Sequence, residues 1–570
     1  MERFVFGLTS SLEKVFPAQA PKALPEGAVI SALRGDVPAV QLYYAKAPKE
    51  GEYNYAQPFT LSVNGAPAPA RLRKVELVPS DFPCYEHADD NYLTTDPGLF
   101  PDVLRPLPDA RIIPKANQYR AVWIDFPELK DVPAGEYRIT VTASADAKFG
   151  WANGAIMDVA DADQLVYTCQ FTLRVLNASL PKQRLIHTEW FHSDGIAQYY
   201  GVRVFSEPFW AIVERYIEMA GRELGINALL TPVFTPPLDT AKDGERLTVQ
   251  LVDVEITDSG YRFNFEKLGR WCEITKRHGV EYLEVSHFFT QWGAKATPKI
   301  VAREHGVMKR IFGWDVPATS PRYREFLQAL VPELRKALEG FGYDHQHVIF
   351  HVSDEPSKEH IEGYLEAKAQ VADLLEGSMV IDALSDYQFY SSGAVEHPVP
   401  ANDHIQPFLD NKVPGLWVYY CCAQCVDVPN RFYAMPSARN RIMGVLMYLN
   451  RIEGFLQWGY NFYNAQFSLR PIDPFKETHA DYAFPSGDPY LVYPGENGAP
   501  LSSIRGEVQR EGLDDLRALQ LLEELTDRAF VESLIREGRP EAFSFKQYPK
   551  DPEYLLSLKE KVCAEIEKRI

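Results

Sequence analysis

The strongest constraint on the fold lies after residue 184, where short apolar segments alternate with longer amphipathic ones. Short apolar runs are typical of buried strands, whereas apolar residues three or four positions apart are typical of helices. Alternation of the two favours a parallel sheet, and eight strands are the number in a closed (β/α)8 barrel. The strands that we predict are Leu185–Trp190, Ala228–Thr231, Tyr282–Ser286, Val348–His351, Met379–Leu384, Asp403–Gln406, Leu416–Tyr420 and Phe455–Trp458.

Helical patterns fall between some of these strands. In Phe205–Leu224 an apolar stripe includes Phe209, Ile212 and Tyr216, at the spacing of one helix face. The other helices that we predict here are Phe265–Arg277, Pro321–Leu338, Lys358–Leu375 and Ala438–Ile452.

The two ends of the chain have different patterns. Residues 1–180 contain short alternating segments broken by Pro and Gly, which predicts an antiparallel β-sandwich. Leu513–Leu525 and Tyr554–Ile570 have helical spacing with charged faces, which we interpret as solvated. We therefore predict a multidomain protein with a sandwich over 1–180, a (β/α)8 TIM-like barrel over 181–510, and C-terminal helices packed on the barrel over 511–570.

Two adjacent acids, Asp354 and Glu355, follow the predicted strand Val348–His351. In a dry pocket at a sheet edge, two carboxylates push their pKa values apart and leave one of them an acid near neutral pH. A structural role also fits, because Asp354 could cap the next helix and Pro356 suits its first turn. The other strand ends favour the chemical interpretation.

Polar and aromatic residues follow most of the predicted strands. Rings pack on the C–H faces of sugars, and charged or amide groups bind sugar hydroxyls. One such ring alone is more often part of a core, but their shared position at strand ends predicts a carbohydrate-binding cleft. The candidates are Glu189, His287, Trp292, Asp386, Tyr387, Tyr419, Trp458 and Asn461.

Composition excludes several classes of partner. The formal net charge of −19 argues against binding to nucleic acid, which needs a basic face. The start of the chain lacks the pattern of a secretory signal, and no stretch is apolar for the length of a membrane helix. We therefore expect a cytoplasmic protein that makes no use of a membrane. A homo-oligomer is compatible with the sequence.

The seven cysteines are an odd number and mostly lie in apolar runs, so we predict reduced thiols. Cys422 and Cys425 form a lone CxxC pattern. A tetrahedral zinc site needs a second pair of ligands at a suitable spacing, and the surrounding sequence offers none. We expect neither a metal nor a cofactor.

Several motifs together resemble glycoside hydrolase family 123, a family of β-N-acetylgalactosaminidases. They are HVSDEP at His351–Pro356, LWVYYCC at Leu416–Cys422, GFLQWGYN at Gly454–Asn461, YLVYP at Tyr490–Pro494, and SSIRGEVQREG at Ser502–Gly512. The resemblance extends from about residue 180 to about residue 525. It implies a retaining, exo-acting, substrate-assisted mechanism, in which the 2-acetamido group of the sugar attacks the anomeric carbon to form an oxazoline intermediate.

By this resemblance Asp354 would orient the acetamide, and Glu355 would be the general acid and base. Adjacent residues suit this division, because consecutive strand side chains do not readily flank a sugar from two sides. From strand position we choose Tyr419 as donor to the acetamido oxygen, with Tyr387 in reserve, and Trp458 as the floor of the sugar site. From strand position we also assign hydroxyl binding to Asn461, Glu189, His287, Trp292 and Asp386.

Three alternatives stay open. The sugar specificity follows from the resemblance alone, so a β-hexosaminidase or a glycosidase for another sugar is one of them. Another is a glycosidase for sugars without an acetamide, with Glu189 or Glu284 as a separate nucleophile. The last is a non-catalytic carbohydrate-binding protein, against which the intact Asp354 and Glu355 argue.

Overall fold

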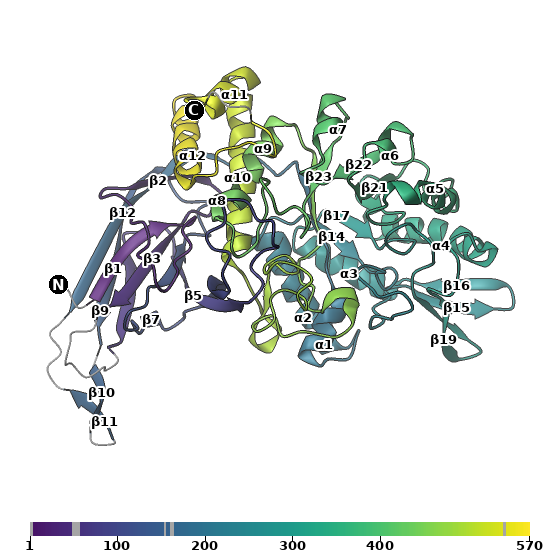
Figure 1. The fold of residues 1–570 in the computed structure, drawn as a ribbon, viewed down its shortest axis with the longest axis horizontal. Coiled ribbons are helices and arrows are strands. Elements are labelled where there is room, and N and C mark those ends of the chain that lie inside the picture. Colours follow the sequence, from purple (N-terminus) through teal and green to yellow (C-terminus); the bar gives the residue numbers. More distant parts are fainter. Residues whose placement is uncertain (1–3, 48–56, 147, 153–154, 160–164, 540–542) are drawn as a thin grey trace.

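The computed structural model describes residues 4–47, 57–146, 148–152, 155–159, 165–539 and 543–570. Figure 1 shows the N-terminal strands at one end of the molecule and the strand–helix alternation at the other. Helix α10 (Ile504–Leu525) runs between these two parts.

The N-terminal region consists of two five-stranded sheets. Their facing sides share one apolar core, to which Leu42 and Val122 of one sheet and Leu61 and Val141 of the other contribute. The pairings in the two sheets are antiparallel except the one between β2 and β12. In sheet order, the strands are β1 (Phe4–Ser10), β3 (Ala39–Lys46), β8 (Arg120–Asp125), β5 (Arg71–Ser80) and β6 (Gly98–Pro106), then β2 (Val29–Arg34), β12 (Val166–Ser179), β9 (Gly135–Ala145), β4 (Phe59–Asn64) and β7 (Arg111–Ile112). A separate hairpin joins β10 (Lys148–Ala152) to β11 (Ala155–Val159).

The second region is built on an eight-stranded, barrel-like sheet in which neighbouring strands pair in parallel. A parallel bridge between Ala401 and Tyr419 joins the two outermost strands. Along the chain, the strands are β13 (Ile186–Glu189), β14 (Ala228–Thr231), β17 (Tyr282–Val285), β20 (Val348–Phe350), β21 (Met379–Leu384), β22 (His397–Pro400), β23 (Trp417–Tyr419) and β24 (Gly454–Gln457).

The prediction of the sixth strand is wrong. We expected it at Asp403–Gln406, but that segment leads into helix α7 (Gln406–Asp410), and β22 lies at His397–Pro400. The signal was hidden because Pro398 and Pro400 fall within the strand, and proline within a short apolar run argues against a central strand. The other seven predicted strands lie where the sequence placed them, within a residue or two at their ends.

Helices follow the strands of the barrel-like sheet. They are α1 (Ser193–Tyr200), α2 (Glu207–Glu218), α3 (Glu266–Arg277), α4 (Pro321–Gly340), α5 (Ile361–Ala369), α6 (Gln388–Ser391), α7 (Gln406–Asp410), α8 (Ser437–Arg441) and α9 (Met443–Leu449). Two hairpins form an accessory sheet from β16 (Gly260–Asn264), β15 (Asp253–Thr257), β18 (Ile300–Glu304) and β19 (Val307–Phe312). After α10 come α11 (Arg528–Arg536) and α12 (Pro552–Glu567).

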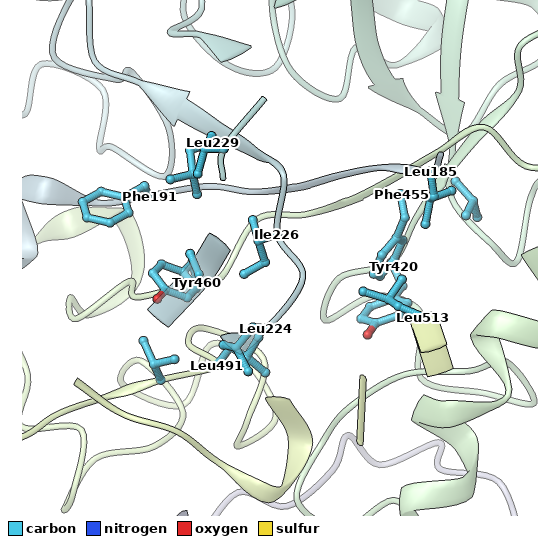
Figure 2. Packing of buried hydrophobic residues seen from close by; sticks show 14 of the residues in the cluster. Leu185, Phe191, Leu224, Ile226, Leu229, Tyr420, Phe455, Tyr460, Leu491 and Leu513 are labelled. Carbon is cyan, nitrogen blue, oxygen red and sulfur yellow. The ribbon is translucent and has the colours of Figure 1, made fainter. Parts of the chain in front are cut away.

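Aromatic and aliphatic side chains join the barrel-like sheet to its surroundings. The ring centroids of Tyr420 and Phe455, from β23 and β24 or just beyond, lie 5.3 Å apart. Figure 2 shows Leu513 of α10 next to Tyr420, and Leu185 above them near Phe455. These side chains are buried, so α10 belongs to the same core as the strands.

The charged face that we expected to be solvated over Leu513–Leu525 is solvated only in part, because Asp514 and Asp515 are buried while Glu524 is exposed. The charged residues at the start of helix α10 are buried as well. Arg505 binds Asp102 of β6 at 2.9 Å, and Glu507 binds Arg73 of β5 at 2.5 Å. Both contacts reach the N-terminal sheets. The helical spacing was read correctly, but spacing alone does not show that ion partners come from strands 400 residues earlier in the chain.

Two glycines set how closely α10 approaches α9. A Cβ atom on Gly444 would lie 1.9 Å from the carbonyl oxygen of Gly512, a separation that side chains do not reach. The absence of a side chain at Gly444 therefore lets the two helix backbones touch. One turn earlier in α10, Gln509 contacts Glu189 of β13.

We expect Arg505→Met to destabilise the protein strongly. The substitution keeps the apolar stem but leaves Asp102 buried without its cation, which typically costs about 3–5 kcal/mol. Arg270→Met is the matched control, because it breaks an equally close pair, with Glu207, at the surface. Thermal unfolding should show a clear fall in midpoint for Arg505→Met and little change for the control; equal midpoints would contradict the role of the buried pair.

Candidate active site

The backbone at the end of β20 directs two consecutive acids to one place. Glu355 has a φ of 43°, in the left-handed region, and its N–H donates to the carbonyl oxygen of Ala383 at 3.2 Å. This turn breaks the alternation by which neighbouring strand residues point to opposite sides. Asp354 and Glu355 therefore line the same cleft.

The cleft lies where several strands of the barrel-like sheet end. It is mostly apolar, with few polar groups, as is usual for small-molecule sites. Besides the two acids its walls are Trp190, Leu238, Asp239, Gln291, Trp292, Ala383, Tyr419, Cys421, Cys422, Leu456, Trp458 and Phe484.

Asp354 is buried and held from one side of the cleft. The side-chain amide of Gln291 donates to its Oδ2 at 2.6 Å, and the backbone N–H of Trp292 donates to its carbonyl oxygen at 3.1 Å. Burial and the neighbouring Glu355 carboxylate raise the pKa of Asp354 well above its ordinary value. A hydrogen bond from Gln291 opposes this rise only in part.

Glu355 is partly exposed and lies toward the opposite wall. The Tyr419 hydroxyl donates to its Oε1 at 2.7 Å, and the Cys421 thiol lies 3.9 Å from the same oxygen. Burial raises the pKa of Glu355, the Tyr419 hydrogen bond lowers it, and the nearby Asp403 raises it again. The acidic pair can therefore retain a proton near neutral pH.

A charged group lies behind the acidic pair. His351 Nε2 is 2.5 Å from Glu284 Oε1, and His351 Nδ1 is 3.5 Å from Asp382 Oδ1. Burial by itself would lower the pKa of His351, but these two carboxylates raise it to about 9. Trp190 also donates to Glu284 at 2.7 Å, so this acid is engaged in the interior and does not line the cleft.

Glu189 is also engaged in the interior. Its carboxylate binds Arg431 at 2.7 Å and accepts from Gln509 of α10 at 2.9 Å. Although burial alone would raise it, Arg431 and His187 lower the pKa of Glu189 to about 2. Glu189 and Glu284, the two candidates for a separate nucleophile, are thus both fully buried and outside the cleft wall.

Two more predicted binding residues lie just outside the cleft. Asn461 is buried and bridges the backbone of His192, with its Oδ1 accepting at 2.8 Å and its Nδ2 donating at 3.3 Å. His287 is buried, with its ring stacked on that of His351 at 4.2 Å. Asn461 therefore holds the backbone of His192, and His287 packs against His351, so neither side chain faces the cleft.

Asp386 and Tyr387 make their contacts at the start of helix α6. Asp386 accepts from the backbone N–H of Gln388 at 2.9 Å, at the start of α6, and pairs with Lys358 at 3.1 Å. The Tyr387 ring packs edge-on against Phe408 at 5.1 Å. Neither residue belongs to the cleft wall.

Both predicted tryptophans line the cleft. The Trp458 indole N–H donates to Asp488 Oδ2 at 3.0 Å, which fixes the ring plane. Burial raises the pKa of Asp488 to about 7, although Arg431 opposes the shift. Trp292 has a φ of 56° and is 39% exposed, so its ring is available to a ligand.

Sequence reasoning missed several residues of the wall. Gln291 immediately precedes Trp292, so it was among the residues that follow a predicted strand, from which we chose the candidates. Nothing in the sequence gave a reason to choose Gln291 itself. Asp239 and Phe484 lie in loops well beyond the ends of their strands, so a search of the positions directly after each strand does not find them. Burial raises the pKa of Asp239 to about 6, which adds a third titrating acid to the cleft.

Within the described residues, no group of three or more His, Cys, Asp or Glu side chains is arranged to hold a metal ion. The seven cysteines are free thiols. In that same part of the chain, no helix has the length and apolar character needed to cross a membrane.

Comparison with known proteins identifies a family. The model of the glycoside hydrolase 123 catalytic domain matches residues 190–522. A family 123 glycoside hydrolase from Clostridium perfringens, solved in a study of glycolipid glycan hydrolysis, has a TM-score of 0.69 at 14% identity, over 99% of this chain and 97% of that one. A family 2 β-galacturonidase from Eisenbergiella tayi has a TM-score of only 0.33 at 10% identity, over 90% and 73% of the chains, and adds no argument. A search of curated sequences found no match.

We expect stability to fall between about pH 6.5 and pH 9 because of His351. Its pKa is raised on folding, so its contribution is complete below the unfolded pKa and is lost as the pH rises through about 9. Urea unfolding at pH 6 and pH 9 measures this fall, on the order of 3 kcal/mol.

His351→Gln should flatten this dependence, because glutamine does not titrate. His347→Gln is the matched control, a partly exposed histidine four residues earlier that pairs with Asp344. An unchanged slope in His351→Gln would contradict the assignment.

Proposed function

Since this chain belongs to glycoside hydrolase family 123 and is a glycoside hydrolase, we propose that it removes terminal β-linked N-acetylgalactosamine with retention of configuration. The observation that carries the proposal is the pair of consecutive carboxylates in one cleft, with Gln291 on Asp354 and Tyr419 on Glu355. The substrate supplies the nucleophile, its 2-acetamido oxygen. No metal and no cofactor take part in this scheme.

Asp354 accepts the acetamido N–H and stabilises the positive charge of the oxazolinium ion. Gln291 orients the carboxylate for this contact, because its amide holds one oxygen at 2.6 Å. A positioned nucleophile inside a dry cleft replaces a bimolecular step with an intramolecular one. Asp354 needs its negative charge in this step, so the proton of the pair must lie on Glu355 once substrate is bound. In the unliganded cleft the pKa of Asp354 is raised more strongly than that of Glu355, so the proposal requires that the acetamido N–H stabilise the Asp354 carboxylate.

Glu355 protonates the leaving oxygen and then removes a proton from the attacking water. A carboxyl with a raised pKa is suited to both tasks near neutral pH. Tyr419 donates to Glu355 in the unliganded cleft. We propose that it turns to the acetamido oxygen when substrate binds, which removes the hydrogen bond that lowers the pKa of Glu355 and so favours the protonated acid.

The sugar ring lies on Trp458, whose plane is fixed by Asp488, and Trp292 closes the cleft from the Gln291 side. The other assignments of hydroxyl contacts, to Glu189, His287, Asp386 and Asn461, and the reserve role of Tyr387, stay predictions. Galacto specificity is part of the proposal, and a β-hexosaminidase with gluco specificity is the alternative outcome of its test.

The finer description of the fold is also a proposal. The bridge between Ala401 and Tyr419 supports closure of the eight strands into a (β/α)8 barrel, and the shared apolar core supports a sandwich. We propose domains over 1–180, 181–510 and 511–570, although α10 crosses the last boundary. A cytoplasmic location and a homo-oligomer stay predictions.

We expect Glu355→Gln and Asp354→Asn to lose most activity on an aryl β-N-acetylgalactosaminide. Loss of a general acid or of charge stabilisation lowers kcat by about 10²–10⁴-fold. Azide should restore turnover of Glu355→Gln on an activated leaving group, because the first step then needs no acid and azide, which needs no general base, attacks the oxazoline in place of water to give the glycosyl azide. Release of the aryl alcohol by each variant measures the effect.

Glu359→Gln is the matched control, an exposed carboxylate four residues after Glu355. A thiazoline mimic of the intermediate should inhibit the wild-type enzyme. If the wild-type enzyme prefers the aryl β-N-acetylglucosaminide, the proposed galacto specificity is wrong and the protein is a gluco-specific β-hexosaminidase. Full activity in either acidic variant would reject the mechanism.

We expect Tyr419→Phe to move the basic limb of the pH profile of kcat/KM upward. The Tyr419 hydrogen bond lowers the pKa of Glu355, so its removal raises the pH at which the general acid loses its proton. The kcat value should also fall, by about tenfold or more. Tyr420→Phe is the control, since this neighbour points to the opposite side of the strand; a Tyr419→Phe limb that stays in place or moves to lower pH would contradict the assignment.

A further inference from the structure

The position of the general acid decides on which side the leaving group departs. Glu355 contacts Tyr419 and Cys421, whereas Gln291 and Trp292 lie beside Asp354. The acetamide therefore faces the Gln291 side of the cleft. The glycosidic oxygen must lie within reach of Glu355, so the leaving group passes the wall of Cys421 and Cys422.

The N-terminal region reaches the outside of this wall. Tyr85, in the connection between β5 and β6, donates its hydroxyl to the carbonyl oxygen of Ala483 at 2.8 Å. Burial and the neighbouring Cys422 thiol raise the pKa of Tyr85. Tyr92, in the same connection, donates to the carbonyl oxygen of Cys425 at 2.8 Å. A segment far from the acidic pair in sequence thus forms the rim next to it.

This rim carries a row of aromatic side chains, Phe82, Tyr85, His87 and Tyr482, which we call the rim strip. Ring centroids are 6.1 Å apart for Phe82 and Tyr482, 5.5 Å for Phe82 and Tyr85, and 6.3 Å for the stacked Tyr85 and His87. Phe484, two residues after Tyr482, lines the cleft 5.2 Å from Trp458. The segment from Tyr482 to Phe484 therefore contributes aromatic rings both to the rim strip and to the cleft.

The rim strip is held rigidly. Asp81 pairs with His479 at 2.7 Å and accepts from the Tyr482 hydroxyl, and the backbone N–H of Ser486 donates to the carbonyl oxygen of Phe82 at 3.0 Å. Rings that only joined the two regions would be covered, but Tyr482 is 58% exposed and His87 is exposed. A fixed, uncovered row of rings is suited to binding a ligand with little entropic cost.

We propose that the rim strip binds the sugar residues on the leaving-group side of the scissile bond, so that the N-terminal region selects the substrate. The inference rests on the proposed function, because the side of departure follows from the role of Glu355. The natural substrate is then an oligosaccharide chain with a terminal β-linked N-acetylhexosamine, and not a simple glycoside.

The charge of the rim identifies the class of glycan. The segment from residue 81 to residue 90 carries four acids, Asp81, Glu86, Asp89 and Asp90, and contains neither Lys nor Arg. Asp81 pairs with His479 and Asp89 with Arg439, so the exposed Glu86 and Asp90 give the rim its negative charge. A glycan with carboxylate or sulfate groups at this position would meet charge of the same sign. Neutral sugars can lay their C–H faces on the rings without this repulsion.

Paired substrates test the inference. One is an aryl β-N-acetylgalactosaminide, which has no sugar beyond the scissile bond, and the other is a neutral tetrasaccharide with the same terminal sugar. We expect Tyr85→Ala and the double variant His87→Ala/Tyr482→Ala to lower the ratio of kcat/KM for tetrasaccharide over aryl glycoside by about tenfold, the cost of one lost aromatic anchor. Tyr137→Ala is the matched control, since Tyr137 is also a partly exposed N-terminal tyrosine whose hydroxyl donates to a backbone carbonyl; its ratio should equal that of the wild type.

Calorimetry with the trisaccharide leaving group alone gives a readout that does not need turnover. The wild type and Tyr137→Ala should bind it, and His87→Ala/Tyr482→Ala, whose substitutions are at exposed positions, should bind about tenfold more weakly. Equal ratios and equal affinities in all variants would overturn the inference, as would preference for an acidic trisaccharide. Failure of the wild type to cleave either substrate would reject the proposed function, while the calorimetric comparison would still decide the inference.

Discussion

The left-handed backbone at Glu355 is the constraint on which the site depends. On a regular strand, Asp354 and Glu355 would point to opposite sides, and only one could face the cleft. A φ of 43° at a residue other than glycine costs free energy, which the hydrogen bond from its N–H to Ala383 helps to offset. In return, two carboxylates with raised pKa values contact different walls of one small pocket. This local geometry lets the two adjacent acids take different roles in the proposed mechanism.

Buried charge connects that pocket to the rest of the molecule. Arg431 binds Glu189 on β13 and the carbonyl oxygen of Gly459 beyond β24, next to Trp458. Gln509 of α10 completes the group, and the same helix binds the N-terminal sheets through Arg505. A buried ion pair contributes less to net stability than its Coulomb energy suggests, but it strongly disfavours arrangements in which a partner is missing. The N-terminal region, α10 and the cleft wall are thus fixed relative to one another.

The sequence predicted well those features that depend on local pattern. Seven strands of the barrel-like sheet, the family and the placement of Asp354 and Glu355 after β20 follow from apolar runs and ordered motifs. β22 was misplaced because Pro398 and Pro400 disguise a strand whose pairing is set by its neighbours. A search of the residues directly after each strand could not find Phe484 or Tyr85, because long connections bring them to the cleft or its rim. Exposure of charged helix faces was also misjudged, since a periodic pattern does not reveal partners from distant strands.

The stereochemical course of hydrolysis tests the central claim most directly. Proton NMR can follow the anomeric signal of the sugar released from an aryl β-N-acetylgalactosaminide before mutarotation. The account predicts that the β-anomer forms first, because the acetamido oxygen and then water attack in succession at the same carbon, with Asp354 and Glu355 assisting. Initial formation of the α-anomer would contradict it, since a single displacement by water would require two acids on opposite sides of the sugar.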